Sequence, residues 1–142
     1  PQMVLFSGPR DVRELKPKQK GAKASFSNDW TSEDIPVLAR GFLKAGDLLF
    51  TAGPEDHMKG ILNAEMAHEG HAKLELQDKA WKGEAGGRLC VSSSNGGKLL
   101  KEYELKSPPV LDGMAAAYNR IYISCMDGRV ICFEGERASR PE

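Results

Sequence analysis

The sequence predicts an all-β protein made of β-propeller blades, which are four-stranded antiparallel sheets stacked face to face. Two internal sequence similarities support this prediction. Residues 36–53 align without a gap on residues 109–126, and Gly-Arg followed by an apolar residue stands at 87–89 and again at 128–130. In addition, the clearest strand pair, residues 119–134, carries apolar residues on both faces, as is typical of a sheet covered on both sides. Repeated strand units of this kind bury their faces only by stacking on one another.

The bulk composition excludes several partners. The 142 residues suffice for one core or a short stack of repeats. Twenty basic and twenty acidic side chains cancel, so no global field favours nucleic acid, and the apolar runs are far shorter than the roughly 20 residues of a membrane span. Three cysteines show no metal spacing and leave an odd thiol. We therefore expect no nucleic-acid partner, no membrane span and no disulfide scaffold.

Residues 1–30 precede the first copy of the repeat and are either the remnant of a preceding blade or a basic loop. Two short stretches, 3–6 and 24–30, are candidate strands that belong to a preceding blade or fill an open edge of the last blade. Between them, residues 10–23 carry six Lys or Arg against Asp11 and Glu14. Few aromatic residues accompany these charges, which favours a solvated loop over a phosphate-binding surface. Because the chain starts at Pro1, without an initiator methionine, we expect a processed or partial product whose compartment cannot be identified.

The first copy, residues 31–106, is the predicted penultimate blade. Its strands are expected at 37–45, 47–52, 87–93 and 98–105. The turn at 94–97, Ser-Asn-Gly-Gly, consists of residues that tolerate left-handed backbone. The two internal similarities differ in the distance between their copies along the chain: 73 residues for the first and 41 for the second. This difference places an insertion at 54–86 between the middle strands.

This insertion is predicted to be helical over about residues 55–84, since it contains good helix formers and few β-branched residues. Leu74 and Leu76 belong to a broken apolar stripe along it. The candidate metal ligands are Glu65, His68 and His71, which recur at i, i+3 and can share a helix face. The spacing is not that of an HExxH motif, and zinc needs three or four convergent ligands. A surface helix is therefore the preferred interpretation, with metal binding as an alternative.

The second copy, residues 107–135, is the predicted last blade. Its first strand, 110–117, is rich in small residues, which suits a crowded inner position. Asp127-Gly128 is a strong hairpin signal. We predict a two-residue turn that pairs Met126 with Arg129 and places Cys125 and Cys132 on one buried-looking face. The chain reaches its tail, 136–142, soon after the third strand, so this blade lacks its fourth strand and leaves an edge open.

Residues 96–135, GGKLLKEYELKSPPVLDGMAAAYNRIYISCMDGRVICFEG, resemble the pyrroloquinoline-quinone-like (quinoprotein-like) β-propeller repeats, most closely the C-terminal blades of larger bacterial PQQ-like repeat proteins. Those blades combine a run like SPPVxDGMAAA with a hairpin like GRLYxSxxDGRVxCF. The resemblance covers about residues 28–135. It implies that the chain is part of a larger propeller, and only through this family is a periplasmic or extracellular location expected.

The same resemblance bears on chemistry. Quinoprotein dehydrogenases hold the quinone and Ca²⁺ with axial carboxylate, Asn and Arg side chains, and they carry a docking-motif Trp where this chain has Lys101. The expected inner strand offers only Asp112. We therefore predict no catalytic residue, no cofactor-binding residue and no cofactor. PQQ with calcium belongs to the alternative hypothesis below.

The leading functional hypothesis is a non-catalytic propeller segment that acts as a scaffold or as a binding and interaction module. The alternative is part of a quinoprotein-type, PQQ-dependent oxidoreductase, and the second alternative is metal binding through the histidine-containing insertion. The expected partners are further propeller blades, another copy of the chain or a partner protein, because stacked sheets with open outer faces associate readily.

Overall fold

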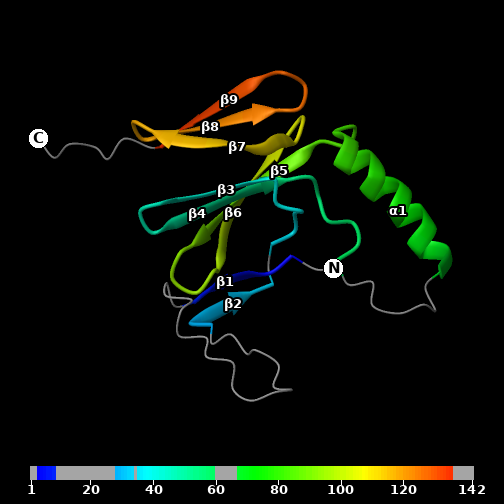
Figure 1. Ribbon diagram of the computed structural model, residues 1–142, viewed down its shortest axis with the longest axis horizontal. Coiled ribbons are helices and arrows are strands. Elements are labelled where there is room, and N and C mark those ends of the chain that lie inside the picture. The colour runs from blue at the N-terminus through cyan, green and yellow to red at the C-terminus, as the bar shows by residue number, and fades with distance from the viewer. Residues whose placement is uncertain (1–2, 9–27, 34, 60–66, 136–142) are drawn as a thin grey trace, which may run out of the picture.

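The computed structural model describes residues 3–8, 28–33, 35–59 and 67–135, with backbone alone for residues 67–70. Its described part consists of three antiparallel sheets, of two, four and three strands, and one helix. The sheets lie in layers, with the four-stranded sheet in the middle and the helix beside the stack (Figure 1). The prediction of an all-β protein with a helical insertion is confirmed.

The middle sheet corresponds to the predicted first copy, residues 31–106. It contains β3 (Gly41–Ala45), β4 (Leu48–Gly53), β5 (Gly87–Ser93) and β6 (Leu99–Leu105), paired in that order. The last three strands fall within one residue of their predicted positions. The first begins four residues later than predicted, because Val37 pairs only in an isolated bridge with Glu55.

The upper sheet in Figure 1 corresponds to the predicted second copy, residues 107–135. It contains β7 (Pro109–Ala117), β8 (Arg120–Cys125) and β9 (Val130–Glu134), again paired in chain order. β7 is crowded at Gly113, where an added Cβ would lie 2.6 Å from a Val110 methyl and 2.9 Å from the carbonyl oxygen of Ser124. The following alanines, 115–117, are exposed. Within the described residues, no strand pairs with the outer edge of β9.

The β8–β9 hairpin corrects the predicted register. Cys125 donates its N–H to the carbonyl of Arg129 over 2.8 Å, and Tyr122 lies opposite Cys132. The loop therefore holds three residues and not two, with Gly128 in the left-handed region at φ 82°. A shift of one residue turns every side chain of β9 to the other face. Cys132, predicted to be buried, is consequently exposed.

The same shift overturns the premise that both faces of this hairpin are equally covered. Ile131 and Phe133 now face the middle sheet, together with Ile121, Ile123 and Cys125. Val130 lies on the opposite face and is 66% exposed. The upper sheet is thus buried on one face and open on the other within the described structure.

The first short sheet pairs β1 (Leu5–Ser7) with β2 (Trp30–Ser32). Neither of these strands pairs with β9, so the described part of the two candidate stretches does not fill the open edge, and residues 24–27 lie outside the described residues. Leu5 instead packs with Ile35, Val37 and Cys90 on the face of the middle sheet away from β7–β9. This small sheet forms the third layer, below the middle sheet in Figure 1.

Two apolar cores hold the layers together. The larger core lies between the middle and upper sheets, and its buried members are Ala52, Leu89, Leu105, Ile121, Ile123 and Cys125. The smaller core, around Val37 and Cys90, lies on the other face of the middle sheet. The middle sheet is thus covered on both faces, as a stacked repeat requires. The three layers form a stack and no closed ring within the described residues, so the propeller stays a prediction.

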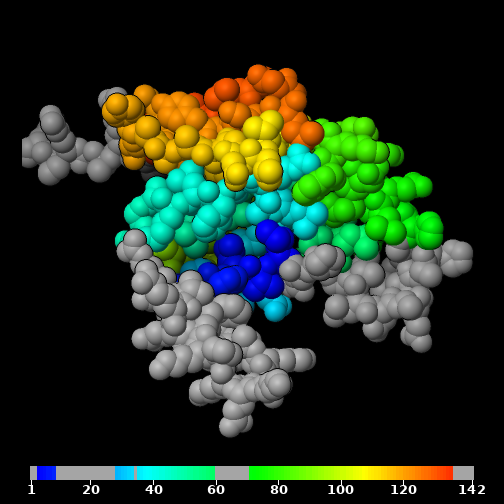
Figure 2. All heavy atoms as spheres, in the orientation of Figure 1, coloured from blue at the N-terminus to red at the C-terminus, as the bar shows by residue number. Residues whose placement is uncertain are grey.

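Helix α1 (Ala67–Lys82) occupies the predicted insertion and lies against the side of the stack (Figures 1 and 2). Gln77 anchors it: its Oε1 accepts the His57 N–H at 2.8 Å, and its Nε2 donates to the Glu55 carbonyl at 3.1 Å. Arg40 donates to the Trp81 carbonyl and stacks 4.2 Å from the Trp81 ring centroid. The Arg40 bond satisfies a carbonyl in the last turn of the helix, whereas the Gln77 bonds satisfy backbone groups of the segment after β4.

The helix is docked through polar contacts more than through an apolar stripe. Leu74 and Leu76, predicted to belong to such a stripe, are about half exposed, whereas Ala80 is buried. No helix in the described ranges has the length and apolar content to cross a membrane.

Candidate binding groove

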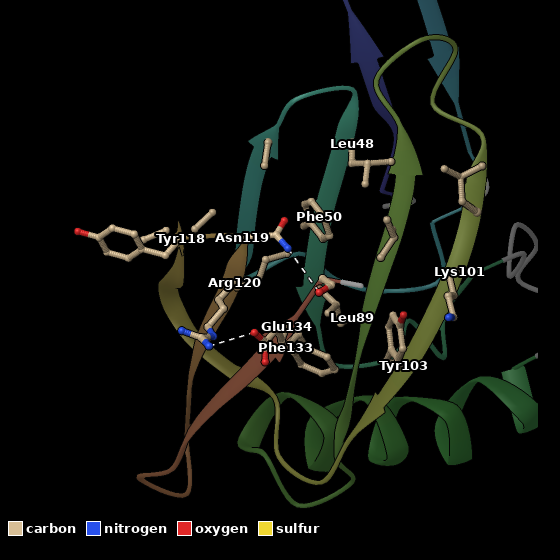
Figure 3. Close-up of a pocket in the computed structure, with 17 residues that line it drawn as sticks. Leu48, Phe50, Leu89, Lys101, Tyr103, Tyr118, Asn119, Arg120, Phe133 and Glu134 are labelled. Atoms are coloured by element: carbon tan, nitrogen blue, oxygen red, sulfur yellow. Dashed lines mark hydrogen bonds and ion pairs between the residues drawn. The ribbon is translucent and has the colours of Figure 1, made fainter. Parts of the chain in front are cut away.

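A groove of about 750 Å³ lies between the middle and upper sheets. Its floor is mostly apolar and comes from the middle sheet: Leu48, Phe50, Leu89, Val91, Leu100 and Tyr103. Its roof comes from the upper sheet: Ala116, Ala117, Ile121, Phe133 and Gly135. Figure 3 shows the labelled floor and roof side chains around one hollow, with Tyr118 projecting away from it.

The groove lies toward one end of the two sheets. Its roof comes from the β7–β8 turn region and the end of β9, and its floor comes from β4, β5 and β6. The inner strands β3 and β7 lie in contact. On the other side, Tyr103 of β6 meets Phe133 of β9 with ring centroids 5.3 Å apart and planes tilted by 54°. The two sheets thus meet at the inner strands and at this aromatic pair.

The polar groups of the groove are few. Arg120 donates to Glu134 over 3.0 Å, and this carboxylate, followed by Tyr122, raises the pKa of the guanidinium. Lys101 lies 5.1 Å from the centroid of the Tyr103 ring, within reach of a cation–π interaction. The Asn119 side chain donates to the Gly135 carbonyl over 3.4 Å and ties the β7–β8 turn to the end of β9 (Figure 3).

This set of groups does not form a catalytic constellation. Among the described residues that line the groove, the carboxylate is Glu134, which Arg120 already engages, and there is no Cys, His or Ser. Acid–base catalysis needs a titratable group near the reacting atoms with a tuned pKa, and nucleophilic catalysis needs a nucleophile next to a base. The groove offers apolar burial with a polar rim, which is a binding arrangement.

The candidate metal ligands are not assembled in the described part of the chain. Glu65 lies outside the described residues, and His68 lies on α1 where the side chain is not described. His71 is exposed on the same helix. Among the described side chains, no three His, Cys, Asp or Glu come together. Asp112, the candidate of the inner strand, is exposed in a bulge at φ 54° and donates its N–H to the Arg40 carbonyl.

A second polar cluster surrounds Arg88, one of the two repeated Gly-Arg positions. Its guanidinium contacts Glu55 at 3.1 Å and Glu102 at 3.8 Å, and the hydrogen bond to Glu55 raises its pKa. The adjacent hollow measures about 230 Å³. Arg88 thereby joins the segment after β4 to β6. Because Arg88 engages both carboxylates and so links neighbouring segments, we interpret the cluster as structural.

The sequence anticipated the open edge of the last blade but not the groove. The predicted strands contain Phe50, Val91 and Tyr103, but the sequence gives these residues no site role. The groove depends on how one sheet lies over the next, which the pattern of a single strand does not report. Basic residues 10–23, the other candidate surface, lie outside the described residues.

Comparisons of the chain with protein-family models, with curated proteins and with solved structures found no match. The resemblance to quinoprotein-like repeats therefore stays a prediction, and the functional argument depends on the groove itself.

Proposed function

We propose that this chain is a non-catalytic β-propeller segment that serves as an interaction module, with the groove between its middle and upper sheets as the binding surface. The observation that carries the proposal is the groove of about 750 Å³ with its apolar floor. This volume is in the range of ligand-binding clefts, which are roughly 300–1,000 Å³. The missing catalytic groups among its described lining residues support binding over turnover.

The structure also offers a way to block the groove without disturbing the core. Ala116 lines it and Ala115 does not, although both are exposed neighbours on β7. Successive side chains of a strand point to opposite faces. Ala116→Arg therefore fills the groove, while Ala115→Arg places the same charge on the outer face as a matched control.

The test uses anilinonaphthalene sulfonate, a fluorescent probe of exposed apolar surface. We expect saturable binding by the wild-type chain and by Ala115→Arg, and a loss of about tenfold in affinity for Ala116→Arg, equal to about 1.4 kcal/mol. Equal binding by both variants would place the probe elsewhere and contradict the proposal.

A second titration separates binding from the oxidoreductase alternative. The chain is mixed with pyrroloquinoline quinone and Ca²⁺, and dye-linked oxidation of alcohols and sugars is followed. We expect neither stoichiometric cofactor absorbance nor turnover. A stable one-to-one quinone adduct would refute the non-catalytic assignment.

A further inference from the structure

We propose that Asn95 is a modification site: it loses its side-chain amide spontaneously, as ammonia, through a cyclic imide formed with the backbone nitrogen of Gly96. The products are aspartate and isoaspartate at position 95. The inference concerns the turn between β5 and β6 and is independent of the groove. Its basis is the hydrogen bonding and packing of this turn, which leave the two reacting groups unoccupied and bury the residue after them.

The reaction needs an asparagine followed by an unhindered backbone amide. The Gly96 nitrogen attacks the side-chain carbon Cγ of Asn95, so a nitrogen–carbon bond forms while the Cγ–Nδ2 bond breaks. Nδ2 takes up the Gly96 amide proton and leaves as ammonia. Water then opens the ring at one of its two carbonyls. Opening at Cγ gives aspartate, and opening at the main-chain carbonyl gives isoaspartate, whose backbone runs through the former side chain.

The attacking nitrogen is unoccupied in the described structure. The N–H groups on either side of it are bonded: Asn95 donates to the Ser93 hydroxyl over 3.1 Å, and Gly97 donates to the Ser93 carbonyl over 3.1 Å. Among the described residues, the Gly96 N–H has no acceptor. An added Cβ at Gly96 would meet no atom within 4 Å, and glycine itself has none to hinder the attack.

The side chain under attack is also unrestrained. Asn95 is exposed, and within the described part of the chain its side-chain amide makes no hydrogen bond. The Ser93 hydroxyl donates to the main-chain carbonyl of Asn95 over 3.1 Å. This oxygen belongs to the same peptide group as the Gly96 nitrogen, so the hydrogen bond stabilises the anion that forms when the amide proton leaves. The turn therefore favours ring closure.

The other described asparagines lack these conditions. Asn28 donates its side-chain amide to a hydroxyl over 3.2 Å, and the next backbone N–H, that of Asp29, donates to a carbonyl over 2.7 Å. The side chain of Asn119 donates to a backbone carbonyl over 3.4 Å, and the bulky Arg120 follows it. We therefore expect the Asn-Gly turn to react first.

The place of the turn makes one product disruptive. Gly97 is buried against the β1–β2 sheet (Figure 1): an added Cβ there would lie 2.5 Å from the Trp30 ring and 2.7 Å from the Cβ of Ser32. Isoaspartate at position 95 lengthens the main chain by one methylene shortly before this contact. Aspartate brings the same charge and leaves the backbone length unchanged. We therefore expect isoaspartate, and not aspartate, to displace Trp30.

The first test measures the reaction at each described asparagine. The full chain is incubated in mildly alkaline buffer and digested with trypsin, and the peptide of residues 89–98 is followed by mass spectrometry. We expect Asn95 to deamidate at least about tenfold faster than Asn28 or Asn119. The rate in the folded chain should lie within about threefold of that in a synthetic peptide of the same residues, because the turn does not occupy the reacting groups.

A sample digested at zero time corrects for reaction during digestion. Asn95→Gln keeps an amide on a longer side chain and should abolish the rapid mass change. A greater slowing in the folded chain than in the peptide would mean that the turn protects Asn95 and would overturn the inference. Equal rates at the three asparagines would overturn it as well.

The second test separates the two products. The indole N–H resonances of Trp30 and Trp81 are recorded for the wild-type chain, for the purified isoaspartate form and for Asn95→Asp. We expect the Trp30 resonance to shift only in the isoaspartate form, and the Trp81 resonance, from α1, to stay in place throughout. An unshifted Trp30 in the isoaspartate form would refute the structural consequence. An equal shift in Asn95→Asp would assign it to charge and not to backbone length.

Discussion

The three cysteines occupy different environments. Cys90 and Cys125 are buried and Cys132 is exposed. Burial, followed by the charge of Glu102, raises the pKa of the Cys90 thiol to about 12, and burial also raises the pKa of Cys125. The thiolate is the reactive form, so the two buried groups behave as small apolar residues.

Thiol reactivity tests this difference. With an aromatic disulfide reagent at pH 8, we expect Cys132 to react rapidly and Cys90 and Cys125 to react only on unfolding, because they are neutral and inaccessible. Cys132→Ser should abolish the rapid phase. Rapid reaction of two thiols in the folded chain would mean that β9 has the register in which Cys132 and Cys125 share a face.

Cys90 also predicts a pH dependence. Its folded pKa of about 12 exceeds the ordinary value of about 8.5. Its contribution to stability is therefore complete below about pH 8.5 and is lost as pH rises toward 12, because the unfolded state releases its proton first. The free energy of unfolding should fall by about 1 kcal/mol per pH unit above roughly pH 9, measured by urea titration. Cys90→Ala should flatten this decline; an unchanged slope would contradict the assigned burial.

Gly128 determines the hairpin loop. Its φ of 82° is unfavourable for other residues, and no atom lies within 4 Å of an added Cβ, so substitution tests conformation alone. Gly128→Ala should lower the free energy of unfolding by about 1–2 kcal/mol, and Gly128→Asn by less, since Asn tolerates this region. Denaturant titration measures both. If the Gly128→Ala variant were as stable as the wild-type chain, that result would contradict the left-handed conformation assigned to Gly128.

At the scale of elements, local signals located strands more reliably than they fixed register. Residues 87–93 were predicted as a strand and form β5 with those bounds. Asp127-Gly128 marked the right hairpin, but Gly128 accepts left-handed backbone in a two-residue or a three-residue loop. Which of the two forms depends on packing of Ile131 and Phe133 against the middle sheet. That packing is tertiary and cannot be read from the turn residues.

In the helical insertion, too, the sequence located the element but did not fix its placement. Its composition predicted a helix, whereas its attachment through Gln77 to the segment after β4 had no sequence signature. Side-chain bonds to backbone groups of a distant loop depend on the folded geometry.

Removal of the Gln77 attachment should lower the free energy of unfolding by a measurable amount. Gln77→Ala leaves the His57 N–H and the Glu55 carbonyl without their partner, which should lower the free energy of unfolding by about 1–3 kcal/mol and accelerate exchange of the His57 amide. Leu76→Ala, at an exposed position on the same helix, is the matched control with an expected change within about 0.5 kcal/mol. Equal effects of the two substitutions would show that Gln77 does not dock the helix.

At the scale of the whole molecule, the repeat predicted stacking, and the described sheets do stack. The groove was not predictable in the same way. It depends on the alignment of the inner strands β3 and β7 between two sheets. Sequence patterns report pairing within a sheet, by alternation and turns, but they carry little information on how one sheet is placed over the next.

The central claim is that the middle sheet is covered on both faces by separate sheets. Side-chain nuclear Overhauser contacts of the full chain in solution test it most directly. We expect contacts from Phe133 to Tyr103 on one face and from Leu5 to Val37 on the other, in the same dilute sample. Observation of the Phe133 contacts without those of Leu5, or of neither, would contradict a three-layer stack.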